Sequence, residues 1–70
     1  MTRWRADYQQ KYFYVDEFAE SKYDIDLRHD EDNRRYEAGN YFLTRFEADA
    51  VGAKIRAILD EHNKQEGGGE

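Results

Sequence analysis

The clearest hydrophobic pattern in this sequence lies towards its C-terminus. Apolar residues recur there at intervals of three and four positions, at Ala48, Val51, Ile55 and Ile58, and the same spacing continues to His62. This spacing places them on one face of an α-helix and does not fit a strand. Thr44 can cap the start of such a helix, and Glu47 can reach back to the Thr44 amide to complete a capping box. We therefore predict an amphipathic helix from Arg45 to about Lys64.

Two stretches upstream of this helix have the pattern of β-strands. Lys11–Val15 reads KYFYV, and aromatic and β-branched residues of this kind favour strands. Successive side chains of a strand point to opposite faces, which puts Tyr12 and Tyr14 on one face and Phe13 and Val15 on the other. Phe18–Leu27 alternates more loosely. We predict that these two strands form a hairpin with its turn at Asp16-Glu17.

The two faces of the second stretch differ in polarity. Its apolar face is formed by Tyr23, Ile25 and Leu27, and its charged face by Lys22, Asp24, Asp26 and Arg28. An antiparallel strand that packs on a core with one face and meets water with the other shows this pattern. We therefore expect Asp24 and Asp26 to be exposed to solvent.

A polar break, His29–Asn33, follows the hairpin. Asp30 is placed to cap a short helical turn that ends at Gly39, since glycine tolerates the positive φ that terminates helices. Tyr41–Leu43 is then short, apolar and aromatic, so we predict a third strand there.

Together these elements predict an α+β fold, in which a small antiparallel sheet of about three strands packs against one long C-terminal helix. The expected core consists of Phe13, Val15, Ile25, Phe42, Val51, Ile55, Ile58 and Leu59. Seventy residues suit one domain, which we assign to residues 1–66. The glycines that follow indicate a disordered tail over residues 67–70.

Composition and charge indicate the cellular compartment and the solubility that we expect. The chain has no cysteine, which favours a reducing compartment, the cytoplasm of a host cell. No stretch of the sequence has the length and apolarity of a membrane span or a signal peptide, so we expect a soluble protein. The net charge is −5 at pH 7, and acidic side chains concentrate in the middle of the chain, where residues 16–33 hold eight acidic and two basic residues.

Several segments together form a longer motif: Lys11–Val15, Arg35-Tyr36, Gly39–Phe42, Thr44 with Glu47 and Ala48, and Lys54-Ile55-Arg56 in the predicted helix. They resemble small proteins and C-terminal modules of phages and prophages, which carry a K-Y-Y-Y-I hairpin, then R-Y-x-x-G-N-Y-F-x-T-x-E-E-A, then an amphipathic helix. This chain departs from that pattern at Phe46, where a glutamate is usual, and at Phe18-Ala19, where the turn often carries glycine. The resemblance implies a phage-type ββ(β)α domain and, by extension, an anti-defence inhibitor such as an anti-CRISPR protein. It implies no catalytic residues.

The acidic segment is the candidate functional surface. Carboxylates at every second position of a strand lie about 7 Å apart, which approximates the phosphate spacing of a nucleic-acid strand. Such a surface can occupy the basic groove of a nucleic-acid-binding protein, and long-range attraction speeds the encounter. We therefore predict a non-enzymatic inhibitor of a host protein with such a groove, for example a CRISPR effector subunit. The predicted contact residues are Glu20, Asp24, Asp26, Asp30, Glu31 and Asp32, with Tyr23 and Tyr36 as ring anchors.

Other interpretations fit the same sequence. A small interaction or assembly module, monomeric or weakly dimeric, would associate through exposed tyrosines or an uncovered strand edge. A single-strand nucleic-acid binder would use Arg3, Arg5 and Tyr8, since cations and rings alternate in this segment, although the acidic balance of the chain opposes it. The acidic residues could also serve only to keep the domain soluble.

The titratable residues lack the spacing of a metal or catalytic site. With Asp24 in the first position of a calcium loop, His29 takes the place of the required glycine and Arg35 that of the glutamate ligand. Neither His29 nor His62 has a serine, cysteine or metal-spaced partner close in sequence. We therefore predict no enzyme activity, no metal, no cofactor and no direct contact with nucleic acid.

Overall fold

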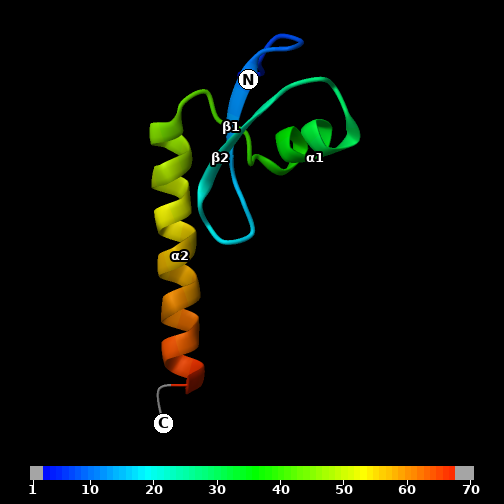
Figure 1. The fold of residues 1–70 in the computed structure, drawn as a ribbon. Helices are drawn as coiled ribbons and strands as arrows, with labels where there is room; N and C mark the ends of the chain where they lie inside the picture. Colours follow the sequence, from blue (N-terminus) through cyan, green and yellow to red (C-terminus); the bar gives the residue numbers. More distant parts are fainter. Residues whose placement is uncertain (1–2, 68–70) are drawn as a thin grey trace.

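The computed structural model describes residues 3–67 of the chain. Over this range it contains two strands and two helices, in the order β1 (Lys11–Val15), β2 (Ser21–Ile25), α1 (Asp30–Ala38) and α2 (Arg45–Gly67). The two helices lie on opposite sides of the β1–β2 hairpin, and α2 is a long rod that extends well beyond it (Figure 1). The predicted α+β class is confirmed, with a smaller sheet than expected.

The hairpin is antiparallel, and its register pairs Lys11 with Ile25 and Val15 with Ser21. Asp16 shapes the loop, because its Oδ1 accepts the backbone amides of Phe18 at 2.9 Å and Glu20 at 3.0 Å. Ala19 adopts a left-handed conformation with φ 62°, which glycine would adopt without strain. The turn begins where the sequence predicts it, but β2 is shorter than the predicted strand over residues 18–27.

The predicted third strand is reduced to one bridge. Phe13 and Phe42 exchange backbone hydrogen bonds of 2.9 and 2.8 Å, and this bridge is isolated from the two strands of the sheet. Next to it, the side-chain amide of Asn40 bonds both the N–H and the C=O of Val15, each at 2.7 Å. A side chain therefore satisfies the edge of β1 where a longer strand would have supplied backbone groups.

Helix α1 is longer than the predicted turn and is capped by another residue. Asp32 accepts the backbone amide of His29 at 3.2 Å, so the carboxylate in the first turn reaches back to the start of the helix. Asp30, predicted as the cap, is instead the first helical residue. Gly39 ends α1 with φ 84°, as predicted.

Helix α2 begins at Arg45, and the predicted capping box is confirmed. The Glu47 amide donates to Thr44 Oγ1 at 3.2 Å, and the Thr44 amide donates to Glu47 Oε1 at 3.3 Å. The helix continues to Gly67, beyond the predicted end at Lys64. Residues 68–70 of the predicted tail lie outside the described residues.

A cluster of tyrosines on the α1 side of the hairpin forms the core. Tyr12 from β1 is fully buried and stacks on Tyr41, with ring centroids 4.2 Å apart and planes 11° apart. Ala6 is buried with them, and Tyr14 and Tyr36 pack against this cluster. Tyrosine rings bury much apolar area, but their hydroxyls still require hydrogen-bond partners. This core therefore contains buried polar groups as well as rings.

The predicted core on the α2 side is confirmed only near the start of that helix. Val15 is buried and Val51 is half-buried, whereas Ile58 and Leu59 are 68% and 50% exposed and Ile55 is 37% exposed. Five-residue strands span about 17 Å, and a 23-residue helix about 34 Å. The hairpin is too short to cover the second half of α2, so the prediction that Ile58 and Leu59 pack in the core is wrong.

Candidate interaction surfaces

Asp26, predicted to be exposed, is fully buried at the end of β2. Its Oδ2 accepts hydrogen bonds from Tyr41 at 2.5 Å, Arg28 at 2.8 Å and Arg5 at 3.0 Å. Its Oδ1 accepts the Arg28 backbone amide at 2.9 Å. Two guanidinium groups and a hydroxyl thus satisfy this carboxylate inside the fold.

These partners decide how the Asp26 group titrates. Burial by itself would raise the pKa of Asp26, but the hydrogen bonds from Arg5, Tyr41 and the Arg28 amide outweigh it and lower the pKa to about 2. Burial and the hydrogen bond to Asp26 raise the pKa of Tyr41 to about 12. The pair is therefore a carboxylate and a neutral hydroxyl at neutral pH.

Asp32, also predicted to contact a partner, is only 3% exposed. It accepts the Tyr12 hydroxyl at 2.6 Å and the backbone amides of Leu27 and His29 at 3.1 and 3.2 Å. Burial by itself would raise the pKa of Asp32, but these three hydrogen bonds outweigh it and lower the pKa. Asp32 therefore fixes the connection between β2 and α1.

The expectation that Asp26 and Asp32 are displayed to solvent is wrong, and the reason lies in β1. The rings of Tyr12 and Tyr14 lie on the face of the hairpin that also carries Asp24 and Asp26. Side chains of α1 pack against this face and shield the two rings from solvent. The face of β2 assigned to water is thus covered at its end, at Asp26, while Lys22 and Asp24 on the same face stay exposed. The carboxylates of Asp32 and Asp26 accept hydrogen bonds from the hydroxyls of the core tyrosines, and Asp26 also accepts them from Arg5 and Arg28.

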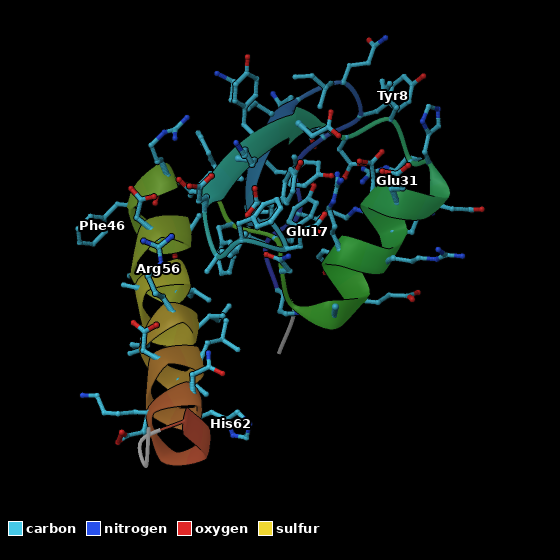
Figure 2. All side chains as sticks on the ribbon, turned by 60° about the horizontal axis from the view of Figure 1, so that its bottom comes forward. Tyr8, Glu17, Glu31, Phe46, Arg56 and His62 are labelled. Carbon is cyan, nitrogen blue, oxygen red and sulfur yellow. The ribbon has the colours of Figure 1, made fainter. Side chains whose placement is uncertain are left out.

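The remaining predicted acidic residues are exposed, but several are paired internally. Arg35 bonds Asp24 at 3.0 Å and Glu31 at 3.4 Å, and Glu20 lies 3.8 Å from the Lys22 ammonium. Asp30 is exposed and forms no ion pair within the described residues. Glu17, in the hairpin loop, and Glu31, on α1, come from different parts of the fold (Figure 2). The structure does not gather the predicted carboxylates into one continuous row.

The two predicted ring anchors differ in accessibility. Tyr23 is exposed on the hairpin, with the Lys11 ammonium 4.7 Å from its ring centroid. Tyr36 is half-buried against Tyr41, and the Arg3 guanidinium lies 4.4 Å from the Tyr36 ring centroid. Only Tyr23 offers a largely free ring.

The basic N-terminal segment also contributes a side chain to the internal network, through Arg5. Arg5 bonds Asp26 and also Asn33, the latter at 2.6 Å. Its guanidinium lies 4.7 Å from the Tyr36 ring centroid. Because this cation already has carboxylate, amide and ring partners, Arg5 is not the free arginine that a single-strand binder uses, whereas Arg3 and Tyr8 are exposed.

The second half of α2 presents an exposed apolar surface. Every residue from Ala53 to Lys64 is exposed, and Ile55, Ile58 and Leu59 follow one another at helical spacing on one side. We call these three residues the α2 apolar face. A shallow hollow lined by Ala57, Ile58, Glu61 and His62 lies beside it. Sequence analysis found this stripe but assigned it to the core.

A second exposed apolar group lies at the other end of α2. Phe46, in the first turn of the helix, is 82% exposed and points away from the rest of the molecule (Figure 2). Leu43, just before the helix, is also exposed. Both side chains lie near the start of α2, apart from the α2 apolar face in its second half.

Comparison with known proteins gave no match, whether with protein-family descriptions, curated proteins or solved structures. The resemblance to phage proteins therefore stays a prediction. Within residues 3–67, neither helix has the length and apolar character needed to cross a membrane. The same residues contain no group of three or more His, Asp or Glu side chains that could hold a metal ion.

Proposed function

We propose that this chain is a protein-binding module and that the α2 apolar face is its contact surface. One observation carries the proposal: three large aliphatic side chains stay exposed on a helix that projects past its own hairpin. Fully burying such a side chain from full exposure contributes roughly 1.5–3 kcal/mol, and a partner gains the part that corresponds to the 37–68% exposure that these three residues keep. A projecting amphipathic helix is a common element of protein recognition.

The rest of the fold supports this role by holding the helix in place. The capping box at Thr44 fixes where α2 begins, and Gly52 lets the helix approach the hairpin loop closely. Arg56 then donates to the Phe18 carbonyl at 3.3 Å, at the point where the hairpin ends. These contacts hold α2 against the hairpin as far as Arg56, beside the α2 apolar face, and a helix held in place in this way loses less entropy on binding.

Affinity capture with matched variants tests the proposal. Tagged wild type, Ile58→Asp and Ala53→Asp are compared in cells that express the chain. Ala53 is exposed and, five residues from Ile58, lies about 140° away around the helix. We expect proteins recovered with wild type and Ala53→Asp to be lost with Ile58→Asp. Equal recovery with all three variants would contradict the proposal.

Inhibition of a nucleic-acid-handling host protein stays a second candidate, supported by the exposed carboxylates that remain. Asp30 and Glu31 project from the first turn of α1, and Asp24 and Glu20 are exposed on the hairpin. A basic groove would contact these four residues without Asp26 and Asp32. Reversal of Asp30 and Glu31 to lysine should then weaken binding to the basic partner and reduce its salt dependence, while Ile58→Asp should not.

A further inference from the structure

We infer that the α2 apolar face pairs with the same face of a second copy of this chain, with the two helices antiparallel. The inference rests on the proposed function and names its partner. Its basis is the charge pattern that borders the apolar side chains.

Two opposite charges flank Ile58 along one edge of the face. Lys54 precedes Ile58 by four residues and Glu61 follows it by three, so both are neighbours of Ile58 on the helix surface. Both side chains are exposed. The edge is thus positive towards the hairpin and negative towards the C-terminal end.

This arrangement is self-complementary in one orientation only. When two antiparallel helices meet around a two-fold axis near Ile58, Lys54 of each copy lies opposite Glu61 of the other, and both ion pairs form by symmetry. In a parallel pair, whose two-fold axis runs along the helices, this edge would instead face the opposite edge of the partner, and Lys54 would not meet Glu61. Charge complementarity therefore selects the antiparallel dimer.

The shape of the molecule favours the same orientation. The hairpin packs only beside the first half of α2, and α1 lies on the far side of the hairpin (Figure 1). Antiparallel pairing through the second halves sends the two hairpins to opposite ends of the dimer, whereas parallel pairing would crowd them side by side. The face is only about two helical turns long, so the interface is smaller than the roughly 1,200 Å² of stable complexes and the dimer is weak.

Sedimentation equilibrium from about 10 µM to about 1 mM, a range suited to weak interfaces, tests the inference. We expect reversible dimerisation of the wild type, a monomer for Ile58→Asp, and an unchanged dimer for the control Ala53→Asp. Because these positions are exposed, the variants keep their fold, which circular dichroism verifies. A wild type that stays monomeric throughout, or a dimer that Ile58→Asp leaves unaffected, would overturn the inference.

Charge reversal tests the orientation. Lys54→Glu and Glu61→Lys should each weaken the dimer about tenfold, and the double variant should restore it, because both ion pairs re-form with exchanged signs. Asp60→Lys changes the net charge as Glu61→Lys does, but lies on the opposite side of the helix from Ile58 and should have little effect. A double variant weaker than either single one would rule out the antiparallel pair.

The two proposals can fail separately. If the wild type remains monomeric while affinity capture recovers other proteins in an Ile58-dependent manner, the proposed function stands and the self-pairing falls. If neither self-association nor capture depends on Ile58, both fall.

Discussion

The Tyr41 hydroxyl donates a hydrogen bond of 2.5 Å to Asp26 and accepts one of 3.0 Å from the Ala6 amide. Tyr12 forms an equivalent pair with Asp32, in which its hydroxyl donates at 2.6 Å and accepts from Arg35 at 2.7 Å. Two stacked tyrosines are thus each joined to a buried carboxylate. These pairs explain why acidic residues that look available in the sequence lie in the interior.

Removing the Tyr41 hydroxyl should destabilise the fold. Tyr41→Phe leaves Asp26 with one donor fewer and the Ala6 amide without its acceptor, both in a buried site. We expect the free energy of unfolding in urea to fall by about 1–3 kcal/mol. Tyr8→Phe, at an exposed position, should change it by less than about 0.5 kcal/mol. A Tyr41→Phe variant as stable as the Tyr8→Phe control would contradict the assigned role.

The Asp26 network should make the fold sensitive to acid. Its carboxyl has a pKa of about 2 in the folded chain, against about 3.9 when unfolded. The group therefore contributes its full stabilisation, on the order of 2 kcal/mol, above about pH 4. This contribution is lost as the pH falls from about 4 to about 2, and the lowered pKa of Asp32 acts in the same direction.

Titration of the Asp26 carboxyl by NMR measures this directly. We expect a midpoint well below the ordinary range for aspartate and a free energy of unfolding that falls with it. An Asp26 midpoint near 4 would show that the carboxylate lacks the partners described above.

Charge reversal separates the structural carboxylates from the exposed ones. Asp26→Lys places a cation against Arg5 and Arg28 in a buried site and should prevent folding. Asp30→Lys, at an exposed position, should shift the melting temperature by only a few degrees. Thermal denaturation followed by circular dichroism compares them. Similar melting temperatures for the two variants would place Asp26 on the surface, as the sequence pattern alone suggests.

Whether alanine at Gly52 raises or lowers the melting temperature tests the packing of α2 on the hairpin. Alanine at an open helical position is favoured over glycine by about 1 kcal/mol. At Gly52, however, an added Cβ would lie 2.7 Å from the Ala19 carbonyl oxygen. We expect Gly52→Ala to lower the melting temperature, because backbone must move to relieve the clash. A rise would mean that the helix and loop are not in close contact.

Local patterns in the sequence were sufficient to predict most elements. Lys11–Val15, the start of α2 at Arg45 and the end of α1 at Gly39 follow from strand propensity, a capping box and a glycine, and all three are confirmed. These signals work because they depend on residues close together in the chain.

The candidate site was harder to predict because it depends on contacts between distant residues. Nothing local reveals that Asp26 meets Tyr41, which lies 15 residues further along the chain, or that Arg5 reaches the same carboxylate. The exposure of Ile58 could not be read from the predicted lengths either, because a strand over residues 18–27 would have been about as long as the predicted helix. The observed β2 has five residues and leaves the second half of α2 uncovered.

Photo-crosslinking from position 58 tests the central claim, that the α2 apolar face contacts another protein, most directly. Benzoylphenylalanine is placed at Ile58 or, as the control, at Ala53, and the chain is irradiated both in cells and when purified at high concentration. We predict covalent protein adducts from position 58, with a second copy or another protein, and few from position 53. If position 58 gives no more adducts than position 53 under either condition, the face is not a binding surface and the account is wrong.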